Sequence, residues 1–225
     1  MSKTEYFQYG DAEIAYLKSR DPVLGEAIDK IGKVSRAVIP DIFMALVNSI
    51  VGQQISTKAH ATIWERMLAR VSPLTAQKIA ALSDEELQSC GISFRKAAYI
   101  KEIAAAVLDG SLDLVALEKQ SDDEVCARLC ALKGIGVWTA EMLLTFSMQR
   151  PDVISYGDLA ILRGLRMLYH HRKITPALFA KYKRRYSPHA TVASMYLWAV
   201  AGGDYGYTDY LPLTEVQKKA KRKRS

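Results

Sequence analysis

The sequence LKGIGVWTAEMLL, residues 132–144, places two glycines around one isoleucine, and a tryptophan follows two residues after the second glycine. Helical patterns flank this stretch over residues 124–132 and 137–148, so the residues KGIG between them predict a tight helical hairpin. Glycine there allows positive φ and close approach of another molecule to the backbone. The N–H groups that begin the second helix form a site for an anion, of which phosphate is the obvious candidate. A purely structural turn fits the same four residues.

A second motif, YGDLAI at residues 156–161, ends in an aspartate that precedes an amphipathic helix. The common role of Asp158 at such a position is to cap the helix N-terminus. An aspartate at a cleft can also direct its second oxygen outward, and the positive end of the helix dipole favours its ionised form. The residues alone leave both roles open.

The composition is that of a soluble globular protein, because 49% of the 225 residues are hydrophobic and 24% are charged. No apolar run approaches the ~20 residues of a membrane span, and the first residues lack an apolar signal core. Three cysteines argue against a disulfide framework. Cys126 and Cys130 are spaced to share a metal, but no second pair of ligands accompanies them, so we interpret them as structural thiols.

The net charge of +7 permits a polyanionic partner without proving one. Part of the excess lies in the basic tail, residues 216–225, which we expect to be disordered. The tail is either a solvated end or a weak electrostatic aid to phosphate binding.

Apolar spacing of three and four residues covers nearly the whole chain and predicts an all-α fold. SDEE at residues 83–86 and SDDE at 121–124 are typical capping boxes, and we expect Pro188 to open the last helix. DVIS at residues 152–155 is a short strand candidate that we interpret as a loop. We expect one domain over residues 1–215, made of two helical lobes with a cleft between them.

The combination of LKGIGVWTAEMLL and YGDLAI resembles the helix-hairpin-helix DNA glycosylases with a Gly/Pro-rich loop ending in Asp, the HhH-GPD superfamily. The likeness is greatest to its 3-methyladenine DNA glycosylase II (alkylpurine) branch. ALVNSIVGQQISTKAH, GISFRKAAYI and SPHATVASMYLWA extend the resemblance over residues 43–198. It implies the two-lobed fold of the compact members, with the N-terminal helices packing on the C-terminal lobe.

The resemblance implies that Asp158 is the catalytic carboxylate of a base excision repair enzyme. The enzyme would flip an alkylated purine (3-methyladenine or 7-methylguanine) out of the duplex and hydrolyse its N-glycosidic bond. The carboxylate would stabilise the oxocarbenium-like sugar. The damaged purine already carries positive charge, so it leaves without much protonation.

Trp138 stands where the related glycosylase/lyases have the lysine that forms a Schiff base, so we expect no lyase activity. Trp138 and Trp198 match pocket-lining aromatics of the alkylpurine branch, where a ring face attracts a cationic base. Core packing is the alternative role of both tryptophans. Met142 occupies a position where that branch can carry a tyrosine, which alters the expected pocket.

Gln54 matches the wedge that fills the gap left by the flipped base, although it and Gln53 can also cap a helix end. The hairpin would bind a DNA phosphate through its amides, with Lys133 at its tip as a further contact or as a solvated lysine. The resemblance adds a monovalent cation (Na⁺ or K⁺) on the carbonyls of Cys130, Leu132 and Ile135, and no required cofactor. The expected partner is double-stranded DNA with damaged bases, bound by a monomer.

Two alternatives stay open. A non-catalytic DNA-binding module would use the hairpin for phosphate docking, and a glycosylase for hypoxanthine, ethenoadenine or an oxidised purine would keep the site with another lesion. A prokaryotic cytoplasm with its nucleoid is the expected location, and the basic tail fits a nucleus equally well.

Overall fold

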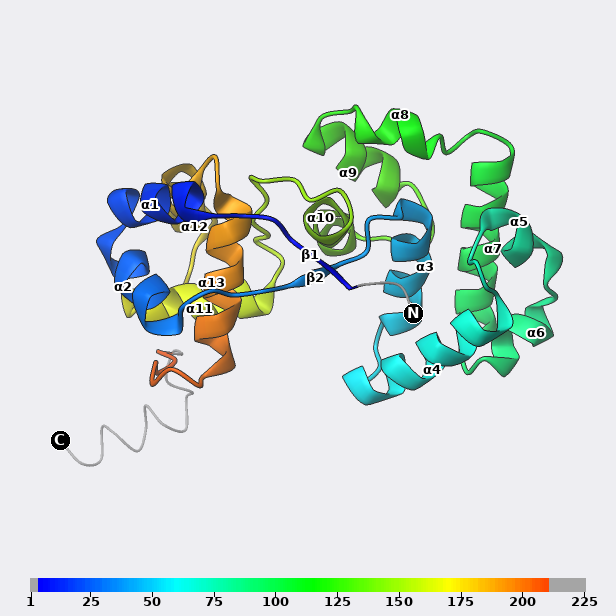
Figure 1. Cartoon of the computed structure of the whole chain (residues 1–225), viewed down its shortest axis with the longest axis horizontal. Coiled ribbons are helices and arrows are strands. Elements are labelled where there is room, and N and C mark those ends of the chain that lie inside the picture. Colours follow the sequence, from blue (N-terminus) through cyan, green and yellow to red (C-terminus); the bar gives the residue numbers. More distant parts are fainter. Residues whose placement is uncertain (1–3, 211–225) are drawn as a thin grey trace. The chain divides into compact units, whose positions relative to one another are not determined.

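The computed structural model describes residues 4–210 and is helical almost throughout, as Figure 1 shows. The chain forms two compact units. Unit 1 consists of Ala37–Gln149 with the first residues of the chain, and unit 2 joins Tyr6–Arg36 to the segment from Arg150 onward. The predicted domain end at residue 215 and the basic tail of residues 216–225 lie outside the described residues.

Unit 1 is built around the largely buried helix α3 and the apolar face of α7. Helix α7 packs against α5, α6 and α3, and α10 packs against α9 and α3. Leu46, Ile50 and Ile100 are fully buried at this core. The elements of unit 1 are β2 (Ala37–Val38), α3 (Ile42–Gly52), α4 (Thr57–Arg70), α5 (Ala76–Ala81), α6 (Asp84–Ser89), α7 (Phe94–Leu108), α8 (Leu114–Glu118), α9 (Asp122–Cys130) and α10 (Val137–Phe146).

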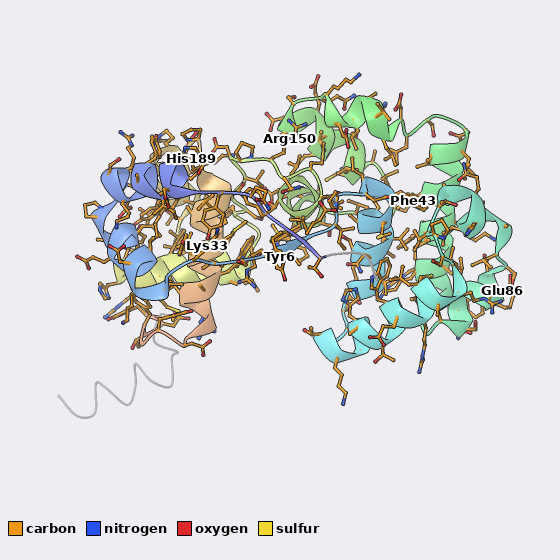
Figure 2. All side chains as sticks on the ribbon, viewed as in Figure 1. Tyr6, Lys33, Phe43, Glu86, Arg150 and His189 are labelled. Carbon is orange, nitrogen blue, oxygen red and sulfur yellow. The ribbon has the colours of Figure 1, made fainter. Side chains whose placement is uncertain are left out.

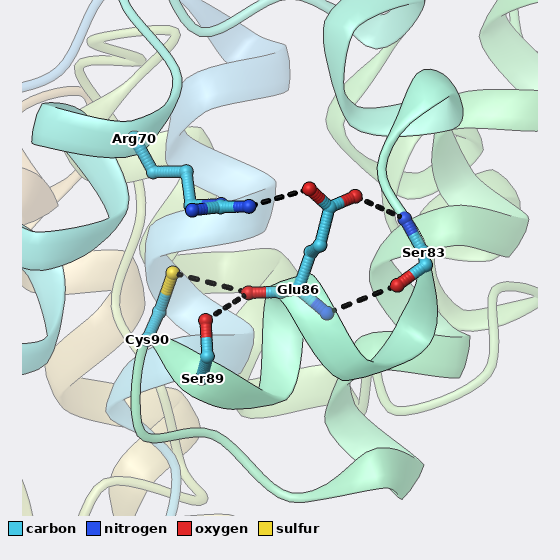
Figure 3. Close-up of polar contacts among 5 residues, drawn as sticks. All are labelled: Arg70, Ser83, Glu86, Ser89 and Cys90. Atoms are coloured by element: carbon cyan, nitrogen blue, oxygen red, sulfur yellow. Dashed lines mark hydrogen bonds and ion pairs between the residues drawn. The ribbon is translucent and has the colours of Figure 1, made fainter.

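Both predicted capping boxes are present. At α6, Ser83 Oγ accepts the Glu86 N–H at 3.1 Å, and Glu86 accepts the Ser83 N–H at 2.8 Å (Figure 3). Arg70 from α4 forms an ion pair with the same carboxylate, so the box also ties two helices together. The Ser83 N–H and the Arg70 guanidinium lower the pKa of Glu86. Ser121 and Glu124 repeat the box at α9.

Unit 2 combines helices from the two ends of the chain. Helix α2 packs against α11 and α13, and α1 packs against α2 and α12. Figure 1 shows α11 and α13 crossing each other. The helices of unit 2 are α1 (Asp11–Arg20), α2 (Pro22–Ile31), α11 (Leu159–Tyr169), α12 (Pro176–Tyr186) and α13 (Ala190–Gly202). The short strand β1 (Glu5–Tyr6) pairs with β2.

Asp21 anchors the N-terminal helices within unit 2. Its side chain is 1% exposed and caps α2 by accepting the Leu24 N–H at 3.1 Å. It also accepts the Tyr169 hydroxyl at 2.7 Å and Arg185 Nη1 at 2.8 Å. Burial, followed by neighbouring Tyr186 and Asp21, raises the pKa of Tyr169 well above its usual value. A buried carboxylate is tolerated here because three donors satisfy it, one of which is the cation Arg185.

Within residues 4–40, the helices are Asp11–Arg20 and Pro22–Ile31. One prediction for unit 2 needs correction. Helix α13 begins at Ala190, with His189 as its N-cap, and not at Pro188. The His189 N–H bonds back to the Tyr186 carbonyl at 2.8 Å, so a turn separates Pro188 from the helix (His189 is labelled in Figure 2). The loop interpretation of residues 152–155 is confirmed.

Helices α11 and α13 approach so closely that only glycine fits at position 164. A Cβ there would meet the carbonyl oxygen of Leu197 and lie 2.9 Å from its carbonyl carbon. Backbone atoms cannot move aside as a flexible side chain can, so any larger residue must separate the helices.

We expect Gly164→Ala to lower the free energy of unfolding by about 1–3 kcal/mol, the usual cost of overpacking. Urea unfolding followed by circular dichroism measures it. Gly202→Ala is the matched control, because a Cβ there meets only Asp204 Oδ2 at 3.9 Å. Equal effects of the two substitutions would show that the helix contact does not carry the cost.

Candidate functional site

The predicted hairpin is present between α9 and α10. Helix α9 begins and ends two residues earlier than predicted, and α10 ends two residues earlier. Helix α9 ends at Cys130, because the Leu132 N–H bonds to the Leu129 carbonyl and tightens the last turn. The Ile135 N–H then bonds to the Leu132 carbonyl at 3.2 Å, while the Ile135 side chain is buried. Gly136 is the N-cap of α10 and offers no side chain at the helix start.

Gly134 meets two separate demands. Its φ is +85°, which favours glycine, and the ring of Tyr99 on α7 occupies the space of a side chain. A Cβ at position 134 would lie 2.5 Å from Tyr99 Cδ2. The hairpin conformation is therefore fixed from outside by α7 and not by its own sequence alone.

A cavity of about 540 Å³ in unit 1 brings four parts of the predicted site together. Gln54, the hairpin glycines, Trp138 and Met142 all line it. Gln53 and His60 also contribute to its wall. The indole of Trp138 is 49% exposed in the first turn of α10, and Met142 lies one helical turn further on. An apolar aromatic surface therefore stands open beside the hairpin.

Gln54 follows the end of α3 and has a left-handed backbone, with φ +56°. Its side chain is exposed. Gln53, and not Gln54, is the C-cap of α3, and its side-chain amide donates to the Gly134 carbonyl at 2.7 Å. Gln53 thus takes the capping role and a contact with the hairpin, and Gln54 is left at the surface.

Asp158 is the N-cap of α11 in unit 2. Its Oδ1 accepts the N–H groups of Ala160 at 2.8 Å and Ile161 at 2.9 Å, and the side chain is 6% exposed. Leu159, the next residue, is 81% exposed. The carboxylate is thus held at the positive end of a helix dipole at the margin of the buried interior.

Comparisons with known proteins identify relatives of this chain. The model of the HhH-GPD superfamily base excision DNA repair proteins matches residues 47–188. DNA-3-methyladenine glycosylase 1 of Schizosaccharomyces pombe is 35% identical over 158 residues, which cover 68% of this chain and 69% of that protein. This chain belongs to the HhH-GPD superfamily.

Solved structures of HhH-GPD relatives confirm the predicted fold. A DNA-3-methyladenine glycosidase from Bacillus halodurans superposes with a TM-score of 0.79 at 36% identity, covering 88% of this chain and 93% of that one. A 3-methyladenine DNA glycosylase of S. pombe in complex with abasic DNA gives 0.73 at 30% identity, covering 84% and 95%.

Two further predicted site residues of this HhH-GPD protein, Lys133 and Trp198, do not line the cavity of unit 1. Lys133 Nζ pairs with Glu102 at 2.8 Å, which raises the lysine pKa, and both side chains are largely exposed. Trp198 is half buried on α13, between the buried Leu197 and Val200. A contact of Lys133 with phosphate must therefore compete with a weak surface ion pair.

The carbonyls proposed to hold a monovalent cation lie at the end of α9 and in the hairpin. The Leu132 carbonyl already accepts the Ile135 N–H, which leaves a second lone pair for a cation. Within residues 4–210, no cluster of three His, Cys, Asp or Glu side chains is suited to a metal. Burial, then Glu141, raises the pKa of Cys126 to about 11, so its thiol is a poor ligand.

Substitution of Gly134 tests how the hairpin is held. We expect Gly134→Ala to be more destabilising than Gly110→Ala, because a Cβ at 134 must displace Tyr99. Gly110 has a similar φ of +81° and nothing within 4 Å of its Cβ position, so it isolates the cost of positive φ, about 1 kcal/mol. Urea midpoints of the two variants decide it, and equal losses would mean that Tyr99 yields freely.

Proposed function

We propose that this protein is a monofunctional DNA glycosylase that releases alkylated purines, 3-methyladenine and 7-methylguanine, in base excision repair. Asp158 is the observation that carries the proposal, because a carboxylate fixed at a helix N-terminus can stabilise a positive charge without moving. Relatives named DNA-3-methyladenine glycosylase, at 35% and 27% identity, support the substrate class.

The leaving base needs little protonation by the protein. An N3- or N7-methylated purine is cationic, so the electrons of the breaking N-glycosidic bond neutralise it as it departs. The sugar becomes oxocarbenium-like, and the Asp158 carboxylate stabilises that charge. Water then adds to the sugar carbon and gives up a proton, leaving an abasic site in an uncut strand.

Trp138 suits a cationic base. An aromatic face attracts a positive charge by about 0.5–2 kcal/mol, and more when both are desolvated. Met142, one turn away, adds a polarisable thioether that adapts to ring shape. This preference would fade once the base leaves as a neutral molecule, which favours product release.

The bound partner in this proposal is double-stranded DNA with a damaged base, engaged by a monomer. The hairpin amides hold a phosphate, and Gln54 fills the gap in the duplex. The S. pombe relative solved with abasic DNA supports this partner class, as does the net charge of +7. No cofactor is required, and Na⁺ or K⁺ binds the hairpin carbonyls.

Asp158→Asn should lower the rate of 3-methyladenine release from methylated DNA by roughly 10²–10³-fold, the cost of losing a transition-state charge partner. The amide oxygen still caps α11, so the protein should fold. Asp113→Asn is the matched control, because Asp113 caps α8 with the same pair of bonds, to Val115 and Ala116 N–H at 2.9 Å. Chromatography of released bases measures both, and undiminished release by Asp158→Asn would refute the assignment.

Absence of lyase chemistry is the second test. With Trp138 in place of an amine nucleophile, the wild-type product strand should stay intact until hot alkali is added. Borohydride should trap no covalent protein–DNA adduct in the same reaction. A trapped adduct seen by denaturing gel electrophoresis would show a Schiff base and overturn the monofunctional proposal.

A further inference from the structure

Helix α7 contacts both the loop after α3 and the hairpin through residues spaced three apart. Lys96 binds the end of α3, Tyr99 packs against Gly134, and Glu102 pairs with Lys133. These residues lie on neighbouring turns of one helical face. The loop that carries Gln54 and the phosphate-binding hairpin are therefore mounted on the same rigid element.

Lys96 secures the loop by capping the end of α3. Its ammonium donates to the Val51 carbonyl at 2.9 Å and to the Gln53 carbonyl at 2.7 Å. Carbonyls at a helix C-terminus have no partner within the helix, and the negative end of the dipole attracts a cation. Partial burial lowers the pKa of Lys96, as expected for an ammonium with reduced contact with water. The backbone at residue 53 is thereby fixed immediately before Gln54.

Gln53 joins this loop directly to the hairpin. Its amide donates to the Gly134 carbonyl at 2.7 Å, across 81 residues of sequence. The Gly134 carbonyl shares a planar peptide with the Ile135 N–H, so the bond also sets the orientation of the hairpin backbone. Gln53 is held at both ends, by Lys96 through its carbonyl and by Gly134 through its side chain.

We propose that Gln53 is a positioning residue that couples the hairpin's hold on a DNA phosphate to insertion of Gln54 into the duplex. The inference rests on the proposed function for the identity of the partner. With the hairpin fixed on a phosphate, Gly134 fixes Gln53, and Gln54 follows one peptide later in a left-handed backbone. A fixed distance between the phosphate-binding hairpin and Gln54 directs Gln54 to one position along the DNA strand.

The test is a mutant cycle of Gln53→Met, Gln54→Ala and the double variant. Methionine keeps length and neutrality but cannot donate to Gly134. We expect Gln53→Met to slow single-turnover release of 3-methyladenine about tenfold, as for loss of one aligned hydrogen bond. Affinity for undamaged duplex should stay within roughly twofold, because phosphate contacts determine it. The double variant should match Gln54→Ala within roughly twofold if Gln53 acts through Gln54.

Gln77→Met, an exposed glutamine on α5, is the matched control and should behave as wild type. The coupling would be overturned if the rate losses of Gln53→Met and Gln54→Ala multiply in the double variant. It would also be overturned if Gln53→Met lowers DNA affinity as much as it lowers the rate of base release. Thermal unfolding checks that each variant folds, and Gln53→Leu is a second neutral variant that removes the donor.

A second readout separates this inference from the proposed function. The fluorescence of 2-aminopurine beside an abasic analogue reports unstacking by Gln54 without any chemistry. Gln53→Met should reduce that signal about as much as Gln54→Ala does. If wild type releases no alkylated purine, the proposed function fails, and the fluorescence still decides the coupling. Full fluorescence with Gln53→Met contradicts the coupling even if base release is confirmed.

Discussion

The contact between Gly134 and the ring of Tyr99 is the constraint on which the site of unit 1 depends. The ring occupies the volume that any side chain at 134 would need, and the backbone there is left-handed. With that position fixed, α10 must begin at Val137, and Trp138 is exposed at its first turn. The aromatic face beside the hairpin is therefore a result of backbone packing as much as of residue choice.

The features that sequence reasoning predicted correctly are local. Two of them are the capping boxes, Ser83 with Glu86 and Ser121 with Glu124, whose partners lie three residues apart. The hairpin is likewise a local feature, because two glycines between two apolar helical patterns predict it. Such signals need no knowledge of the rest of the chain, and the same holds for Asp158 as an N-cap.

The features that it missed join distant residues. Nothing near Gln53 indicates that its amide reaches Gly134, and nothing near Asp21 indicates Tyr169 or Arg185 as partners. Lys96 belongs to the motif GISFRKAAYI, yet its role as a cap for α3 depends on packing between α3 and α7. The start of α13 was misplaced for the same reason, because the turn from His189 back to Tyr186 outweighs the preference of Pro188 for a first turn.

Asp21 also has a consequence for the order in which the chain can fold. Unit 1 comes almost entirely from one continuous segment, Ala37–Gln149, whereas unit 2 needs both ends of the chain. During synthesis, α1 and α2 are made before unit 1, whereas Tyr169 and Arg185, which bind Asp21, are made after it. Unit 1 can therefore fold during synthesis before α1 and α2 have their partners, and Asp21 is solvated by water until then. Helices α11, α12 and α13 then complete unit 2 by packing against α1 and α2.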